Sequence, residues 1–233
     1  MTISAETRKN LESVATATLT GRLQDCGIHQ VFFTGIKPIK PGQRMIGTAK
    51  TLRYAPMRED LLPALSRQVN AQRLAIESIE PGEVMCIEAR GDLSAGTFGD
   101  IYAMRMFQRG ATGIVTDGCV RDSGAVGKLE IPVYLRAAHA ATLSLSHLSV
   151  DYDRPVTIGG VLVMPGDVIV GDDDGAMVIP IALVDEVAAE AAEQELRDEF
   201  SFGLVSKGDT IAQAFPMNPE RKAEFDVWKA ARA

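Results

Sequence analysis

Cysteine and histidine are scarce in this chain of 233 residues, which contains three of each. Cys26, Cys86 and Cys119 are widely spaced and never form a CxxC pair, so the sequence indicates neither a disulfide framework nor a zinc site. The histidines are equally scattered, and none belongs to an HxH or HExxH pattern. We therefore expect neither a histidine-based metal site nor a Ser-His-Asp triad.

Long uncharged stretches and an excess of basic residues are also missing. No apolar run approaches the roughly 20 residues that a membrane-spanning helix needs, and the first residues lack the apolar core of a signal peptide. The formal net charge of -7 argues against a surface that neutralises nucleic-acid phosphates. We expect a cytoplasmic protein with no nucleic-acid or membrane partner, and a small anionic substrate that binds at a local positive site.

The pattern of apolar residues predicts an α/β protein with one compact domain. Helical spacing predicts helices over residues 4–26 (one or two short ones), 58–78, 100–109 and 183–200. Short apolar runs bounded by turn residues predict strands within 43–54, 84–88, 114–116 and 133–135, and a β-meander of short strands over 150–179. The alternation of strands and helices in the middle of the chain favours a sheet that is covered by helices.

The middle of the chain also holds the residues that suggest chemistry. A glycine-containing loop ends at Gly99 and Asp100 and opens one predicted helix, and Arg121-Asp122 follows the next strand. Loops and helix N-termini converge at the edges of α/β sheets, where ligands bind. The first backbone N–H groups of the helix favour a bound anion.

Arg121 and Asp122 suit different parts of a 2-oxo acid. The guanidinium fork of an arginine matches a carboxylate, and an aspartate provides oxygen to a hard cation such as Mg²⁺. Taken alone, however, Asp100 is more typical of a helix N-cap, and an Arg-Asp pair after a turn is usually a surface ion pair. The spacing by itself leaves both interpretations open.

At these residues the chain resembles the 4-hydroxy-4-methyl-2-oxoglutarate aldolase family, which also includes the regulator of ribonuclease E activity A (RraA). The signature of that family is an Asp, twenty intervening residues and then Arg-Asp, and Asp100, Arg121 and Asp122 fit it. Further matches are the segments 16–19 (TATL), 110–118 (GATGIVTDG) and 163–175 (VMPGDVIVGDDDG). The similarity covers about residues 12–200 and leaves 201–233 as a C-terminal extension.

The resemblance implies a single RraA-like domain of the swivelling β/β/α type with flanking N- and C-terminal helices. It also implies a homotrimer or homohexamer with sites at subunit boundaries, and Mg²⁺ or Mn²⁺ as the cofactor. Carried over position by position, Asp122 ligates the metal, Arg121 binds the substrate, and the substrate loop consists of Gly99, Asp100, Ile101 and Tyr102.

The chain departs from the family pattern at two places. Several active relatives have an acidic residue three places after the metal aspartate, where this chain has Ala125, and an Asp is common where it has Gly21. In some relatives a glutamate from the late helix of a neighbouring subunit completes the site. Glu195 and Glu199 are the candidates here, although a solvated helical face is the simpler role for both.

The resulting hypothesis is a metal-dependent lyase that cleaves a C–C bond of a pyruvate-like 2-oxo acid. Retro-aldol cleavage of 4-hydroxy-4-methyl-2-oxoglutarate and decarboxylation of oxaloacetate pass through the same pyruvate enolate, whose charge a metal at Asp122 would stabilise. A metal-bound water relayed through Asp100 is the suggested proton donor. Two alternatives stay open: a sugar-acid dehydratase or 3-deoxy-2-oxo sugar acid aldolase, and a non-catalytic protein-binding regulator of an RNA-degrading enzyme.

Overall fold

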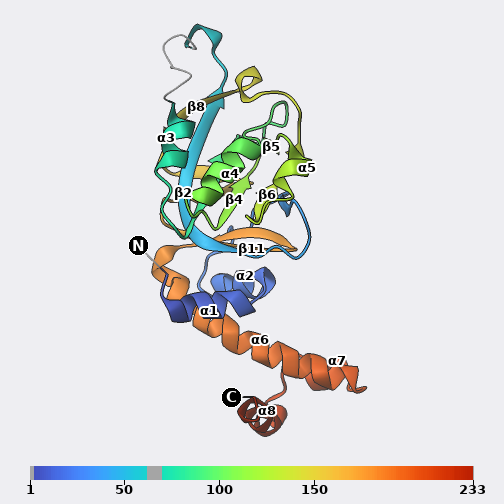
Figure 1. Ribbon diagram of the computed structural model, residues 1–233. Helices are drawn as coiled ribbons and strands as arrows, with labels where there is room; N and C mark the ends of the chain where they lie inside the picture. Colours follow the sequence, from blue (N-terminus) through green and yellow to red (C-terminus); the bar gives the residue numbers. More distant parts are fainter. Residues whose placement is uncertain (1–2, 62–69, 233) are drawn as a thin grey trace.

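A computed structural model describes residues 3–61 and 70–232 of the chain, and Figure 1 shows its arrangement. The helices are α1 Ala5–Ser13, α2 Thr16–Asp25, α3 Ala71–Glu77, α4 Asp100–Gln108, α5 Ser123–Val126, α6 Val184–Ser206, α7 Ile211–Ala214 and α8 Lys222–Ala230. The strands are β1 Lys37–Pro38, β2 Met45–Pro56, β3 Glu83–Glu88, β4 Gly113–Thr116, β5 Cys119–Val120, β6 Val133–Leu135, β7 Ala137–Ala138, β8 His147–Tyr152, β9 Val156–Ile158, β10 Val161–Val163, β11 Val168–Asp172 and β12 Gly175–Ile179.

The main sheet is mixed and has the strand order β1-β6-β4-β3-β2-β11-β12, with β8 also paired to β2. Its central strands β2, β3, β4 and β6 are parallel to one another. Helices α3, α4 and α5 lie between consecutive parallel strands in the chain, as such crossovers require. The loops that follow β3, β4 and β6 therefore leave the same edge of the sheet.

Side chains alternate between the two faces of the sheet, and each face has its own core. In β3, Val84 and Cys86 join the core that includes apolar residues of α1, α2 and α6, whereas Met85 and Ile87 join the core under α3, α4 and α5. This alternation follows from the period of two in a strand. The predicted α/β layering with helices over the sheet is therefore present.

Most of the expected elements form near their expected places. The first segment is two helices, α1 and α2, and Gly27 follows them with φ 79°, a left-handed conformation that glycine adopts without strain. The single helix expected over residues 58–78 was wrong: α3 begins only at Ala71, because Asn70 is extended and caps its N-terminus, and Glu59–Leu61 is a 3-10 turn. Residues 62–69 lie outside the described residues.

The short strands expected over 150–179 form two hairpins that belong to different sheets. β9 and β10 pair with each other around a Gly159-Gly160 turn and form a separate two-stranded sheet. β11 pairs with β12 and also with β2, so this hairpin extends the main sheet. The short strands form as predicted, but the continuous meander was wrong, because β11 pairs with β2 and not with β10.

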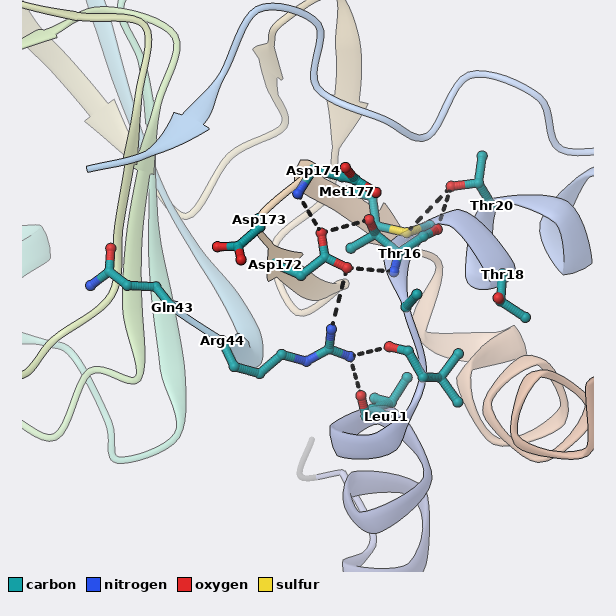
Figure 2. Close-up of polar contacts among 12 residues, drawn as sticks. Leu11, Thr16, Thr18, Thr20, Gln43, Arg44, Asp172, Asp173, Asp174 and Met177 are labelled. Carbon is teal, nitrogen blue, oxygen red and sulfur yellow. Dashed lines mark hydrogen bonds and ion pairs between the residues drawn. The ribbon is translucent and has the colours of Figure 1, made fainter. Parts of the chain in front are cut away.

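Asp172, at the end of β11, joins the N-terminal helices to the sheet (Figure 2). Its carboxylate accepts hydrogen bonds from the backbone N–H of Thr16 at 2.7 Å and from its hydroxyl at 2.9 Å, which caps the start of α2. Arg44 lies 3.5 Å from the same carboxylate and donates to the carbonyl oxygens of Leu11 and Val14. These contacts fix the α1–α2 turn against β2 and β11.

Helix α6 begins against the sheet and then runs away from it, with α7 and α8 at its far end (Figure 1). It extends six residues beyond the predicted end at residue 200. The last helix packs on it through Phe200, Phe225 and Trp228, whose ring centroids are 5.6 to 6.0 Å apart. Within the described residues, no helix is both long and apolar enough to span a membrane.

Candidate functional site

The Arg121-Asp122 pair lies in an open depression beside the N-terminus of α4. The depression has a volume of about 620 Å³. Its lining residues come from the start of α4, from β5 and α5, and from the loop after β7: Asp100, Val120, Arg121, Asp122, Ser123, Gly124, Ala125, Ala138, His139 and Ala140. These segments meet because β5 and β7 follow two neighbouring parallel strands and pair with each other.

Two glycines allow the loop before α4 to contact the Arg-Asp pair closely. A Cβ atom on Gly99 would lie 2.6 Å from Oδ2 of Asp122, and one on Gly96 would lie 2.3 Å from Cγ of Arg121. Neither position tolerates a side chain unless the functional residue moves. The backbone N–H of Arg121 also donates to the carbonyl of Phe98 at 2.8 Å, so the loop and the pair form one unit.

The side chain of Arg121 is anchored at one edge of its guanidinium group. Its Nε donates to the carbonyl oxygen of Ala140 at 3.1 Å. No carboxylate of the described residues forms an ion pair with Arg121. The two Nη groups are therefore oriented and free of a competing anion, which suits a bidentate contact with a carboxylate.

The carboxylate of Asp122 is exposed, and no described residue donates a hydrogen bond to it. The residue has φ 52° and ψ 35°, a left-handed conformation that is uncommon outside glycine, at the position before α5. Such backbone strain is found most often at functional sites. A carboxylate held in this way is available to a ligand.

The other residues of the predicted substrate loop divide into two groups. Asp100 is the first residue of α4 and lines the depression, where its Oδ1 accepts from the backbone N–H of Ile101 at 2.8 Å. Ile101 and Tyr102 are not among the lining residues. The side chain of Ile101 is 79% exposed, and the hydroxyl of Tyr102 accepts from Arg73 of α3 at 3.2 Å. Substrate roles for these two residues stay predictions.

The buried Thr97 connects the loop before α4 to β5 through hydrogen bonds. Thr97 donates to the carbonyl of Cys119 through both its N–H and its hydroxyl, at 2.7 and 2.8 Å. Its own carbonyl accepts from Gln72 at 2.9 Å and from Tyr54 at 3.2 Å. The loop before α4 and the segment before Arg121 are thus tied together inside the core. Burial raises the pKa of the Cys119 thiol, which argues against a nucleophilic role.

Sequence reasoning missed His139, which lines the depression opposite the start of α4. Its backbone N–H donates to the carbonyl of Val120 at 3.1 Å. Its Nδ1 accepts from the N–H of Ala141 at 3.1 Å, so Nε2 carries the proton of the neutral ring. Its position four residues after a predicted strand was a usable signal, because loops after parallel strands meet at one edge.

The two glutamates considered as partners from a neighbouring subunit have contacts within their own chain. Glu195 accepts from the N–H of Ala15 and from the hydroxyl of Thr18, both at 2.8 Å, at the start of α2. Glu199 lies 2.6 Å from Arg232. Within the described part of the chain these contacts explain both side chains, and a role at a neighbour's site stays a prediction.

The donor set of the depression fits a hard cation that keeps most of its water. Asp122 and Asp100 are its two carboxylates, and no group of three or more His, Cys, Asp or Glu residues within 3–61 and 70–232 could hold a metal ion. The depression therefore lacks the four protein ligands of a structural zinc site. Mg²⁺, in contrast, is commonly bound through one or two carboxylates and several waters.

Comparison with known proteins identifies the family of this chain. The model of the family described as "RraA-like: Aldolase/RraA" matches residues 16–178, which include the whole depression. The chain belongs to the RraA-like family. The match confirms the resemblance that the Asp100 and Arg121-Asp122 spacing indicated.

Individual members of the RraA-like family are similar over most of the chain. A protein of Halalkalibacterium halodurans, provisionally named 4-hydroxy-4-methyl-2-oxoglutarate aldolase, is 32% identical over 77% of this chain and 80% of its own length. Legionella pneumophila protein DlpA is 28% identical over 85% of this chain, which spans only 31% of DlpA.

Solved structures of the RraA-like type confirm the predicted fold class. A protein from Pseudomonas syringae pv. tomato has a TM-score of 0.80 and 26% identity, and covers 92% of this chain and 98% of its own. A Streptomyces coelicolor protein, described as an unusual member of the RNase ES inhibitor RraA family, has a TM-score of 0.78 and 32% identity, and covers 86% of this chain and 98% of its own.

Proposed function

We propose that this chain is a lyase that cleaves a C–C bond of a pyruvate-like 2-oxo acid, with Mg²⁺ or Mn²⁺ as its cofactor. The observation that carries the proposal is the meeting of Arg121, Asp122 and Asp100 in one depression. The provisional aldolase name of the Halalkalibacterium relative supports it. Cleavage of 4-hydroxy-4-methyl-2-oxoglutarate and decarboxylation of oxaloacetate are the two reactions that the site suits best.

Each side chain in the depression has a separate role in this proposal. Arg121, held at Nε by the carbonyl of Ala140, binds the substrate carboxylate through its two Nη groups. Asp122 and Asp100 are the carboxylates that would hold the divalent ion. When bound, this ion supplies a positive charge beside the 2-oxo oxygen, where negative charge develops as the bond breaks.

The carbon that loses its bond must then receive a proton. Asp100 and His139 are the two residues in the depression that suit this step, each through a bound water or directly. The hydrogen bond that Nδ1 of His139 accepts leaves Nε2 as the ring nitrogen available for proton transfer. His139→Gln tests the second route, because loss of the donor slows turnover without weakening substrate binding. Asp100→Asn tests the first and is assayed at saturating Mg²⁺, since Asp100 is also a proposed metal carboxylate.

The deciding experiment measures pyruvate release from oxaloacetate and from 4-hydroxy-4-methyl-2-oxoglutarate, with Mg²⁺ and with EDTA. We expect metal-dependent release by the wild type and a loss of at least about 100-fold in Asp122→Ala, because the variant lacks the carboxylate that would hold the cation, whose positive charge would stabilise the transition state. Asp226→Ala, on the distant helix α8, is the matched control and retains full activity. A rate equal to the metal-only blank for both acids, or one unchanged by EDTA, contradicts the proposal.

A regulatory role is the second candidate function. The similarity to the Streptomyces protein, which is described in connection with an RNase ES inhibitor family, favours it. In that case neither acid is turned over, while the chain binds an RNA-degrading enzyme and lowers its activity. A panel of sugar acids, assayed in the same way, tests the remaining alternative, a sugar-acid dehydratase or 3-deoxy-2-oxo sugar acid aldolase.

A further inference from the structure

A second cavity, of about 410 Å³, lies at the same sheet edge. Three of its residues follow three neighbouring parallel strands: Arg90 follows β3, Asp117 follows β4 and Arg136 follows β6. The Gly159-Gly160 turn between β9 and β10 closes it. The carboxyl ends of parallel strands are where α/β sheets bind ligands, and the volume is that of a small-molecule site. We refer to it as the Arg136 pocket.

The guanidinium group of Arg136 lies close to two glycines. A Cβ atom on Gly91 would lie 3.0 Å from Nη1 of Arg136, and one on Gly35 would lie 3.6 Å from its Nε. Both glycines have positive φ angles, 66° and 76°. The backbone N–H of Arg136 donates to the carbonyl of Gly118 at 3.2 Å, which fixes the start of the side chain. Arg136 is exposed, and these two glycines leave room for its guanidinium group at the rim of the pocket.

The turn beside Arg136 is held by a buried carboxylate. Asp117 is 5% exposed and accepts from the backbone N–H groups of Ala89 at 2.5 Å and Gly91 at 2.9 Å. These bonds hold Arg90 and Gly91 in consecutive left-handed conformations, with φ 61° and 66°. Burial raises the pKa of the Asp117 carboxyl, and the two N–H bonds oppose this change. Both carboxylate oxygens of Asp117 are thus occupied by backbone hydrogen bonds within the turn.

The remaining charges of the pocket leave Arg136 without a counterion. Glu88 lies 3.5 Å from Arg53, and Arg90 lies 3.4 Å from Asp92. Among the described residues, no carboxylate lies within 4.0 Å of the Arg136 guanidinium. An exposed arginine beside a cavity whose acids are engaged elsewhere is suited to an anion from solution.

We propose that the Arg136 pocket binds a small anion with a carboxylate or phosphate group, at a site separate from the Arg121-Asp122 depression. The anion forms a two-point contact with the guanidinium of Arg136. Thr34 and Thr157 also line the pocket and are the residues proposed to contact the polar remainder of the ligand. This inference does not depend on the lyase activity.

Calorimetric titration at constant ionic strength tests the proposal, with inorganic phosphate in one arm and malonate in the other. We expect wild-type protein to bind at least one of the two, and Arg136→Met to bind it at least about tenfold more weakly, because a charge-assisted contact is lost. Arg154→Met removes an exposed arginine outside the pocket and serves as the matched control, with unchanged affinity. Stronger binding of phosphate or of malonate identifies the anionic group.

Arg121→Met distinguishes the two cavities. Equal binding by wild type and Arg136→Met, loss of binding in Arg121→Met alone, or no binding of either anion by the wild type overturns the proposal. Circular dichroism confirms that each variant folds. If Arg136→Met does not fold, Arg136→Lys takes its place, since it keeps the charge but loses the planar fork, and we expect it to bind more weakly than the wild type.

Discussion

At the scale of single residues, glycines decide how closely the loops of the candidate site approach one another. Gly99 has an extended backbone, with φ −129°, that any residue can adopt, so its importance lies in the space beside it. That space holds Oδ2 of Asp122. A methyl group at position 99 thus tests the placement of Asp122 directly, without backbone strain.

We expect Gly99→Ala to reduce lyase turnover on the order of 100-fold, because the added Cβ displaces the Asp122 carboxylate by a distance that catalytic sites do not tolerate. The free energy of unfolding should change by less than about 0.5 kcal/mol, since the displaced group is exposed. Steady-state kinetics and urea unfolding measure the two effects. Gly203→Ala, on α6 with no atom near its added Cβ, is the control, and equal turnover in both variants contradicts the prediction.

At the scale of elements, the start of α2 depends on a carboxylate that is far away in the sequence. Asp172 caps this helix and also faces the partly buried Arg44, as Figure 2 shows. Burial lowers the pKa of the Arg44 guanidinium, and the nearby Asp172 opposes that change. Asp172 therefore offsets part of the unfavourable effect of burying the Arg44 charge.

Asp172→Ala should lower the free energy of unfolding by about 2–4 kcal/mol, because it removes a helix cap and leaves a charged group without its partner. Urea unfolding followed by far-UV circular dichroism measures the loss. Asp174→Ala is the matched control from the same turn, since its carboxylate accepts no hydrogen bond from a described residue, and it should change stability by less than about 0.5 kcal/mol. Equal midpoints for the two variants would show that the cap contributes nothing.

At the scale of the whole molecule, the C-terminal helices form a unit that is separate from the two cores of the sheet. Helix α8 buries only Phe225, and it packs against the half of α6 that runs away from the sheet. Trp228, the single tryptophan of the chain, lies in this unit. Regions with few buried apolar contacts unfold at lower free energy than a core.

Trp228 fluorescence should therefore change at a lower urea concentration than the far-UV circular dichroism signal, which reports mainly the sheet and its helices. Phe200→Ala, which removes the ring between Phe225 and Trp228, should lower the fluorescence midpoint further and leave the main dichroism transition in place. Coincident transitions in the wild type would mean that the whole chain unfolds as one cooperative unit, and the prediction would be wrong.

The sequence by itself determined the local elements and the residues that carry the proposed chemistry. Periodicity predicted α4 and the parallel strands beside it, because the burial of one face imposes its period on the residues. The spacing from Asp100 to Arg121-Asp122 predicted the family, and the structure brings these three residues into one depression. The end of α2 before Gly27 was likewise readable from local backbone preferences.

Only the tertiary structure decided which distant loops meet. His139 joins the depression, Asp172 caps α2, and Arg136 lies between Gly35 and Gly91 because neighbouring strands bring together segments that are far apart in the chain. Periodicity reports which face of an element is buried, but it does not report which strand becomes its neighbour. The pairing of β11 with β2, which overturned the expected meander, has the same cause: strand order depends on packing across the whole sheet.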